Sequence, residues 1–475
     1  MKLFNTMTRQ KEEFIPLVKG EVRIYSCGPT VYNYFHIGNA RPFVTFDTLR
    51  RYFEYKGYKV IYVQNFTDID DKMIVQANAA NVTVRELADK YIEEYFKDAD
   101  ALSIRRASFH PRATETVEDI LNLIKTLEEK GFAYVADDGV YFDIERFEGY
   151  GQLSNYNLEE LEENASHTQK AESGKRNQSD FVLWKFKKED EPFWESPWGD
   201  GRPGWHIECS AMSLKYLGEQ IDIHCGGQDL IFPHHENEIA QSEAATGKKP
   251  FVRYWLHNGF INIDNRKMSK SKGNFFTVRD IVQEYSHNII RFFLLSAHYR
   301  SPINFSSDQL DAAQSGLERI QNCIKSIDLE ISSRPKFTGY EKTSLDKDLE
   351  LEKSIEAAQE GFVRSMDDDL NTADAISYIY TLVRDINIAL IDNHKLSIRA
   401  LSNAKYKIYE LMSVLGVNVF HEEDKIPKEV RNLSEERTRA KKDRDFARAD
   451  MLRDQILEMG YEVRDTADGT LLTKI

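Results

Sequence analysis

The stretch VRIYSCGPTVYNYFHIGNARP, residues 22–42, opens the pattern that decides the fold. Its apolar start predicts a strand at 22–27, and the Gly-Pro turn after it leads into a helix predicted to end near Tyr55. A second strand is predicted for KVIYVQN at 59–65. Strand, turn, helix and strand in this order are typical of a parallel α/β sheet, in which ligands bind outside the carboxyl ends of the strands.

The following residues are predicted to extend, interrupt and then complete this sheet. TDIDDK at 67–72 predicts a long amphipathic helix capped by Thr67 or Asp68. From about Pro111 to Gly201 the pattern changes to a helix, two short strands (FAYVAD and GVYFDI), an acidic run and an irregular segment rich in Trp, Pro and Gly, which indicates an insertion. The sheet is predicted to resume with a helix at 206–217, the strand IDIHC, a helix containing HHENE, and a strand pair through YWLHNGFINID.

The C-terminal part of the chain is predicted to be mainly helical. A loop rich in Lys, Ser and Gly, NRKMSKSKGN, separates it from the sheet. The predicted helices are 277–297, 308–330, 346–365, 370–393 and 396–415, which together indicate a helical bundle. A polar linker, a charged helix at 428–459 and a hairpin with Asp468-Gly469 as its turn are predicted to follow.

The composition indicates an ordinary globular protein of several domains. The chain has 475 residues, of which 41% are hydrophobic and 30% charged. No apolar signal region and no bilayer-length apolar segment is present, so we expect a cytoplasmic protein that makes no membrane contact. Four cysteines are too few for a disulfide framework. The net charge of −15 argues against non-specific nucleic-acid binding, although residues 437–448 hold six basic and two acidic residues.

Side chains that bind metals are concentrated in GWHIECSAMSLKYLGEQIDIHCGGQDLIFPHHENE, residues 204–238. His234 and Glu238 are four residues apart in a predicted helix, so both side chains leave the same face and can bind one cation. Cys209 and the distant Cys27 can supply two more ligands, and such a set suits zinc. At this point the alternative is a pair of ordinary buried thiols beside a solvated helix pair.

Three short motifs have the chemistry of a nucleotide site. HIGN at 36–39 lies where a strand gives way to a helix, and the helix N-terminus together with Gly38 suits a phosphate. GGQD at 226–229 offers a close backbone approach and one carboxylate, that of Asp229, for ribose hydroxyls. KMSKS at 267–271 places lysines and hydroxyls on a loop suited to gripping a polyphosphate. Taken singly, these motifs equally fit a structural histidine, a plain turn and a basic surface loop.

In this order along the chain, HIGN, GGQD and KMSKS resemble the class I aminoacyl-tRNA synthetases. CGPTVY, TDIDDK, RPGWHIECSAM, FPHHENEIAQ and KMSKSKGNFFTVRD are together similar to the cysteinyl-tRNA synthetase family, and the resemblance covers nearly the whole chain. It implies an α/β Rossmann-like parallel-sheet catalytic domain with an insertion, then a helical bundle and a small C-terminal α+β domain. The implied ranges are 1–110 and 202–264 for the two halves of the catalytic domain, 111–201 for the insertion, 265–305 for the KMSKS loop and stem-contact region, 306–420 for the tRNA-binding bundle and 421–475 for the anticodon-binding domain.

The resemblance also implies the site residues. One zinc ion per chain is expected on Cys27, Cys209, His234 and Glu238. ATP, with Mg²⁺, is expected on Thr30, His36, Gly38, Asn39, Gly226, Gly227, Asp229, Lys267 and Lys270. Among these, the expected catalytic residues are His36, Asn39, Lys267 and Lys270. L-cysteine is expected on Gly28, Thr67, Trp205 and His224.

The implied reaction has two steps. The carboxylate of cysteine attacks the α-phosphate of ATP to give cysteinyl-adenylate and pyrophosphate, and a terminal ribose hydroxyl of tRNA-Cys then attacks the activated carbonyl. Zinc binds a thiolate far better than a hydroxyl, so cysteine is separated from serine without an editing domain. The resemblance further implies a monomer.

One residue departs from the family signature, which ends in a second histidine where this chain has Asn39. An amide can still donate to a phosphate oxygen, so we expect activity to be retained. Two other functions were weighed: a ligase that passes cysteinyl-adenylate to the amine of an amino sugar, and a zinc-dependent RNA-binding module. The terminal basic segment argues against the first, and HIGN together with KMSKS argues against the second. Cys225 and Cys323 are expected to be packed thiols.

Overall fold

A computed structural model of the chain describes residues 1–155, 174–263, 266–267, 276–334, 344–391, 396–419, 427–443, 445–466 and 469–474. The chain forms two compact units, Met1–Asn418 and Val419–Ile475. Each unit has its own core and is treated by itself below. No helix among the described residues combines the length and the apolar character needed to cross a membrane.

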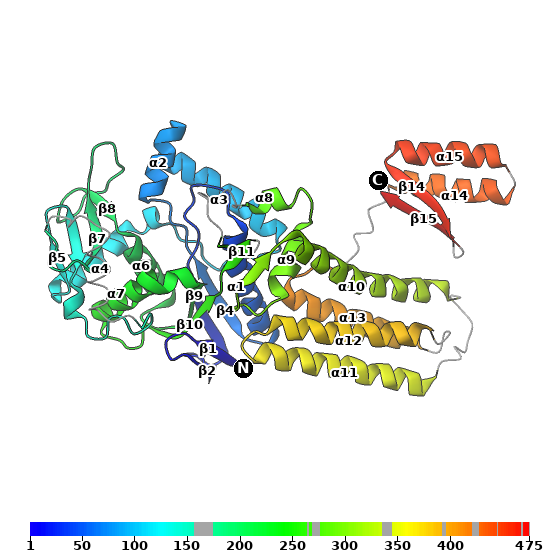
Figure 1. The fold of residues 1–475 in the computed structure, drawn as a ribbon, viewed down its shortest axis with the longest axis horizontal. Helices are drawn as coiled ribbons and strands as arrows, with labels where there is room; N and C mark the ends of the chain where they lie inside the picture. The colour runs from blue at the N-terminus through cyan, green and yellow to red at the C-terminus, as the bar shows by residue number, and fades with distance from the viewer. Residues whose placement is uncertain are drawn as a thin grey trace. The chain divides into compact units, whose positions relative to one another are not determined.

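The centre of the first unit is a four-stranded parallel sheet, which confirms the predicted fold class. Its strands, in spatial order, are β10 (Val252–Asn258), β9 (Ile221–Gly227), β3 (Glu21–Ser26) and β4 (Lys59–Gln64), and every neighbouring pair is parallel. The long helix α1 (Ile37–Tyr55) connects β3 to β4 (Figure 1). The carboxyl ends of β3, β9 and β10 therefore meet at one edge, where ligands bind in sheets of this kind.

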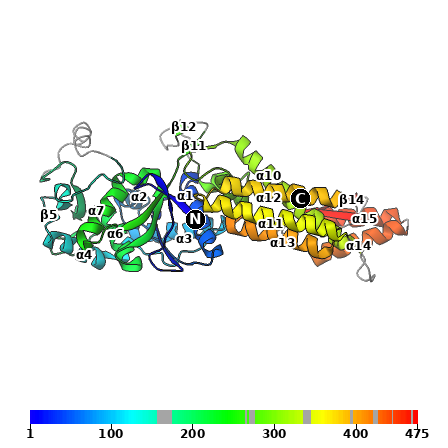
Figure 2. The ribbon, with the colours of Figure 1, turned by 90° about the horizontal axis from the view of Figure 1, so that it is seen from below.

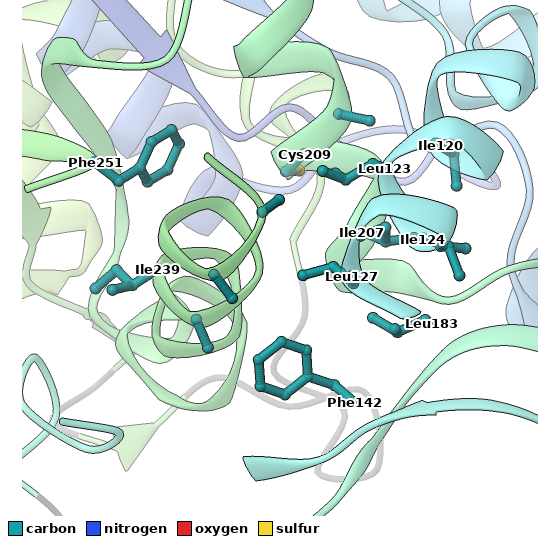
Figure 3. Packing of buried hydrophobic residues seen from close by; sticks show 14 of the residues in the cluster. Ile120, Leu123, Ile124, Leu127, Phe142, Leu183, Ile207, Cys209, Ile239 and Phe251 are labelled. Carbon is teal, nitrogen blue, oxygen red and sulfur yellow. The ribbon is translucent and has the colours of Figure 1, made fainter. Parts of the chain in front are cut away.

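A large apolar core joins this sheet to three helices, α4 (Val117–Glu129), α6 (Trp205–Leu217) and α7 (Glu236–Thr246). On α4 the apolar residues recur at helical spacing, so that Ile120, Leu123, Ile124 and Leu127 all point to the core. Figure 3 shows Leu123 beside Cys209 and Leu127 beside Ile207 of α6, with Ile239 on the far side of α7 in the same core. Cys209 is thus held on a helix that is fixed by packing on both sides.

The insertion is more regular than the sequence predicted. Residues 180–203, expected to be irregular, contain two strands, because FVLWKF forms a buried strand in spite of its aromatic content. The insertion sheet is antiparallel, with the order β5 (Ala133–Val135), β6 (Gly139–Phe142), β7 (Phe181–Phe186) and β8 (Gly201–Pro203). The predicted acidic run lies in residues 156–173, outside the described part of the chain.

Two predicted long helices of the first unit are each divided in the structure. The helix predicted after TDIDDK is α2 (Asp71–Ala80), capped by Asp70 rather than Thr67 or Asp68, followed by α3 (Val84–Ala101). Asn81 breaks it with a left-handed backbone, and Thr83 and Glu86 form a capping box that restarts the helix. The helix predicted at 277–297 is α8 (Val278–Ile281) and α9 (His287–Leu295), the latter capped by Ser286.

The predicted strand pair through YWLHNGFINID is also wrong, because β10 and β11 (Ile261–Ile263) belong to different sheets. β11 lies between β12 (Arg266–Lys267) and β13 (Ile303–Phe305) in a small separate sheet. A hairpin of β1 (Lys2–Asn5) and β2 (Gln10–Glu13) packs beside β10. The pairing of β11 with β13 and the packing of β1 against β10 both join segments that are remote in sequence.

The helical bundle follows the sheet in the first unit. Its four helices are α10 (Ser307–Ser333), α11 (Leu345–Asp367), α12 (Thr372–Ile391) and α13 (Ile398–Leu415), close to the predicted ranges. Figures 1 and 2 both show them side by side. Their buried faces repeat at helical spacing, as in Leu310, Leu317 and Ile324 of α10.

The second unit pairs two helices with a hairpin. The single helix predicted at 428–459 is instead α14 (Lys428–Lys442) and α15 (Phe446–Glu458), the second of which is capped by Asp445. β14 (Tyr461–Thr466) and β15 (Gly469–Lys474) pair antiparallel, which agrees with the predicted hairpin. Asp468, named as part of its turn, lies outside the described residues. A small core of Val430, Ile456, Tyr461 and Val463 holds this unit together.

Candidate active site

Four potential metal ligands meet at the carboxyl edge of the parallel sheet. Cys27 directly follows β3, and Cys209 lies in the second turn of α6. His234 precedes α7, and Glu238 lies in its first turn. One donor atom from each of these four residues lies within 4.8 Å of the others. This donor set, two sulfurs, one imidazole and one carboxylate, can hold a metal ion.

The pair His234 and Glu238 meets as the sequence spacing predicted, with Nε2 of His234 3.1 Å from Oε1 of Glu238. The local backbone differs from the prediction, because α7 begins only at Glu236. Residues Ile231–His235 form a separate irregular turn in which Phe232 has an extended backbone. The four-residue offset survives this kink, so the two side chains still converge.

Other histidines surround the donor cluster. Nδ1 of His206 lies 2.9 Å from Nδ1 of His234, and Nε2 of His224 lies 2.9 Å from Oε2 of Glu238. Nε2 of His235 lies 3.3 Å from Sγ of Cys27, and Cys27, His224, His235 and Glu238 form a second group whose donor atoms are mutually within 4.8 Å. Sequence reasoning assigned no role to His206 or His235. The available signal was the density of histidines around HHENE.

The electrostatics of the cluster favour the ionised forms of Cys209, Glu238 and His234 although these residues are buried, whereas burial raises the pKa of Cys27 well above its ordinary value. The neighbouring thiol of Cys27 donates a hydrogen bond that lowers the pKa of Cys209 to about 6. Burial would raise the pKa of Glu238, but His224 and His234 outweigh it and lower the value to about 2. Burial would lower the pKa of His234, but Cys209 and Glu238 raise it to about 10. Anionic sulfur and carboxylate held out of water fit a bound cation.

A cavity of about 450 Å³ adjoins the cluster and brings two of the sequence motifs together. Cys27 lies in its wall as well as in the donor cluster. The further lining residues that the sequence singled out are Gly28, Thr30, His36, Gly38, Asn39, Trp205, Gly226, Gly227 and Asp229. HIGN and GGQD, far apart in the chain, therefore face one cavity at the carboxyl edge of the sheet.

The HIGN segment forms the start of α1. His36 is the N-cap, and its Nδ1 accepts a hydrogen bond of 3.3 Å from the backbone N–H of Asn39. Because Nδ1 accepts, the proton of a neutral His36 is on Nε2, which can donate to an anion. The first turn of the helix contains no acidic residue. The helix N-terminus therefore presents a positive end to the cavity.

The four residues expected to bind the amino acid differ in position. A Cβ on Gly28 would overlap the carbonyl oxygen of Asn65, so only glycine fits there. Trp205 lies 4.4 Å from His234 between ring centroids, at the cavity wall. Thr67 is buried beside Thr30 through a backbone bridge. His224 is fully buried behind Glu238 and is not part of the cavity wall.

The KMSKS loop is only partly described. The backbone of Lys267 ends β12, while its side chain and all of Lys270 lie outside the described residues. The strand β11 that precedes the loop begins at the wall of the cavity, since Phe260 and Ile261 line it.

Comparison with known proteins defines the class of this fold and site. Residues 13–315 match the family described as tRNA synthetases class I (C) catalytic domain, and residues 361–420 match the DALR domain. Among solved structures, LeuRS of Agrobacterium radiobacter K84 has a TM-score of 0.63 at 13% identity, covering 86% of this chain and 85% of that one. Methionyl-tRNA synthetase of Mycobacterium tuberculosis has a TM-score of 0.60 at 16% identity, covering 83% and 89%. The fold is that of the class I aminoacyl-tRNA synthetases.

Two curated relatives narrow the class to one family. The cysteine–tRNA ligase of Caldicellulosiruptor saccharolyticus is 53% identical over 477 residues, and that of Clostridioides difficile strain 630 is 52% identical over 475 residues. Both alignments cover 100% of this chain and 100% of the relative. The chain belongs to the cysteine–tRNA ligase family.

Proposed function

We propose that this protein activates L-cysteine with ATP and transfers it to the 3′ end of tRNA-Cys. One observation carries the proposal: Cys27 lies both in the metal-donor cluster and in the wall of the cavity formed by HIGN and GGQD. An amino acid held through its sulfur at the cluster would therefore have its carboxylate directed toward a nucleotide in the cavity. Family membership supports the same reaction.

The proposed metal is one zinc ion per chain, held by Cys27, Cys209, His234 and Glu238. Thiolate, imidazole and carboxylate ligands suit this borderline metal. When bound, zinc supplies a Lewis acid that takes a thiolate in preference to a hydroxyl, which separates cysteine from serine. The buried histidines His206 and His224 hydrogen-bond the ligands His234 and Glu238 and fix their orientation.

The nucleotide is proposed to bind across the cavity with its phosphates at the start of α1. His36 and Asn39 donate to phosphate oxygens, and Thr30 and Gly38 allow the close approach. Gly226 and Gly227 leave room for the ribose, whose hydroxyls donate to the carboxylate of Asp229. Lys267 and Lys270 neutralise the charge that develops on the phosphates, with Mg²⁺ accompanying ATP.

The amino acid is proposed to lie between the metal cluster and this nucleotide. Gly28 and Trp205 form the wall that it contacts, and Thr67 and His224 support that wall from the buried side. Its carboxylate attacks the α-phosphate, and the adenylate then reacts with a ribose hydroxyl of the tRNA. The reaction needs no covalent bond to the protein.

The remaining parts of the chain are proposed to bind tRNA. Residues 265–305 are assigned to the acceptor side, the bundle at 306–420 to the tRNA body, and residues 421–475 to the anticodon. Unpaired anticodon bases are recognised by stacking and by hydrogen bonds to their edges. We infer a monomer, and the four free thiols support a cytoplasmic location.

Exchange of pyrophosphate into ATP tests this proposal directly. The purified protein should catalyse exchange with cysteine, should discriminate strongly against serine, and should contain about one zinc ion per chain. It should then attach cysteine to tRNA-Cys. Cysteine-dependent exchange without transfer to tRNA would support the amine-ligase alternative, and RNA binding without exchange would support the binding-module alternative.

A further inference from the structure

Asn258 presents an unpaired hydrogen-bond acceptor at the nucleotide cavity. It is the last residue of β10, directly opposite Gly227 in the register with β9, and it lines the cavity. Its side chain is 4% exposed. Nδ2 donates a hydrogen bond of 3.0 Å to the carbonyl oxygen of Gly259, while Oδ1 is buried and has no partner among the described residues. Buried polar atoms normally have a partner, so this oxygen points to a ligand.

The orientation of this amide is fixed. Rotating the amide by a half turn would place Oδ1 against the carbonyl oxygen of Gly259, with two acceptors in contact. The hydrogen bond from Nδ2 therefore determines which atom faces away from the backbone. With the amide in this orientation, Oδ1 of Asn258 is the atom left to accept a hydrogen bond from a ligand, and an oxygen of this kind cannot donate one.

The backbone that carries Asn258 is also held rigidly. Arg41 of α1 is fully buried and donates to the carbonyl oxygens of Gly259, Phe260, His298 and Ser301. Gly259 packs so closely that an added Cβ would lie 2.6 Å from the carbonyl oxygen of Arg300. The acceptor is therefore preorganised before any ligand binds, which favours its use in selection.

We propose that Oδ1 of Asn258 accepts a hydrogen bond from the 6-amino group of adenine and so selects ATP over nucleotides with a 6-oxo group. This inference rests on the proposed function. Adenosine has only two kinds of hydrogen-bond donor, the ribose hydroxyls and the 6-amino group. Asp229, just beyond the end of the adjacent strand β9, provides the acceptor for the ribose, which leaves Asn258 for the base. A 6-oxo purine would instead bring two acceptors together.

Cysteine-dependent pyrophosphate exchange with nucleotide analogues tests this assignment in the full chain. The nucleotides are ATP, the triphosphate of purine riboside, which lacks the 6-amino group, inosine triphosphate, which has a 6-oxo group, and 2′-deoxy-ATP. In the wild type, removing the 6-amino group should raise KM for the nucleotide by about tenfold, the size expected for one hydrogen bond. The KM for inosine triphosphate should be higher still.

Asn258→Ala should remove this discrimination. The variant should use ATP and the purine riboside triphosphate with KM values within about twofold of each other, and its KM for cysteine and its metal content should match the wild type. Asn304→Ala provides the matched control, since Asn304 lies on β13 and is not part of the cavity wall. This control should keep the full preference for ATP.

Three results would overturn the assignment. The first is a wild type whose KM for inosine triphosphate equals its KM for ATP, a test that requires no variant. The second is an Asn258→Ala variant that still prefers ATP about tenfold over the purine riboside analogue. The third is an Asn258→Ala variant that loses the discrimination between ATP and 2′-deoxy-ATP instead of that between ATP and the purine riboside analogue. This result would place Oδ1 at the ribose. By contrast, a wild type without any cysteine-dependent exchange would contradict the proposed function itself.

Discussion

The guanidinium of Arg291 and the carboxylate of Asp47 form an ion pair of 2.6 Å whose two side chains are 1% and 2% exposed. Arg291 lies on α9 and Asp47 on α1. The same guanidinium donates to the carbonyl oxygens of Leu102, after α3, and Leu415, at the end of α13. One buried cation thus connects the helix that begins at the nucleotide cavity to the last helix of the bundle.

Replacing Arg291 by Met should destabilise the first unit by about 3–5 kcal/mol, because it leaves Asp47 buried with fewer compensating charges. Chemical denaturation followed by circular dichroism measures the change. Arg384→Met is the matched control, since Arg384 is exposed and, among the described residues, pairs only with the adjacent Asp385, and it should cost no more than ~0.5 kcal/mol. Equal losses in the two variants would contradict a special role for the buried pair.

The cost of Arg291→Met should depend on pH. Burial would raise the pKa of Asp47, but Arg291 and Arg51 outweigh it and hold the value below that of a free aspartate. In the wild type the stability from this pair is therefore present above the unfolded pKa and is lost as pH falls toward the folded pKa. In the variant, Arg291 no longer opposes the effect of burial on the pKa of Asp47. This pKa is therefore higher, and Asp47 takes up a proton at a higher pH. The difference in unfolding free energy between the two proteins should thus be smaller at pH 4.5 than at pH 7.

The parallel sheet was predictable because its signals are local. β3, β4 and β9 are short apolar runs, and each is followed by a turn that ends it. The wrong secondary-structure predictions concern segments whose conformation depends on partners elsewhere in the fold. FVLWKF forms a strand because β6 and β8 pair with it. β11 pairs with β13 instead of β10. The break at Asn81 had a local signal, the Thr83–Glu86 capping box, which the amphipathic pattern concealed.

The candidate site was predictable to a different degree. The four-residue offset of His234 and Glu238 was enough to predict that they meet. Nothing in the spacing of Cys27 and Cys209 predicts that they approach, since the end of β3 and the packing of α6 bring them together. Asn258 was not found because its significance depends on a hydrogen bond that is absent, and only the three-dimensional environment of Oδ1 shows this.

Cys209→Ser should remove the bound metal and reduce cysteine-dependent exchange by at least about 10²-fold, since even changes beyond the direct ligands cost 10–100-fold in such sites. Metal analysis of the purified protein and exchange with cysteine and serine are the two measurements. Cys323→Ser is the control, because Cys323 is buried in α10 and its Sγ faces the carbonyl oxygen of Val383. A Cys209→Ser variant with full metal content would remove this residue from the ligand set.

Asn39→His should leave cysteine-dependent exchange within about tenfold of the wild type, a change of ~1.4 kcal/mol in the barrier. The backbone N–H of Asn39 already bonds Nδ1 of His36, and this contact does not depend on the side chain at position 39. Both an amide and an imidazole can donate to a phosphate oxygen. Complete loss of exchange would show that the cavity requires the amide specifically.

A chain that ends at about residue 425 should keep cysteine-dependent exchange within about twofold but should lose at least about tenfold in attachment of cysteine to tRNA. The first unit, Met1–Asn418, contains the donor cluster and the nucleotide cavity, whereas the second unit has its own core. Retained exchange would show that the shortened protein is folded. In the full chain, Arg439→Gln removes one exposed cation from α14 and should raise KM for tRNA while reducing its salt dependence. Unchanged attachment to tRNA in the shortened chain would exclude the second unit from tRNA binding, because loss of an anticodon contact must weaken the complex on which transfer depends.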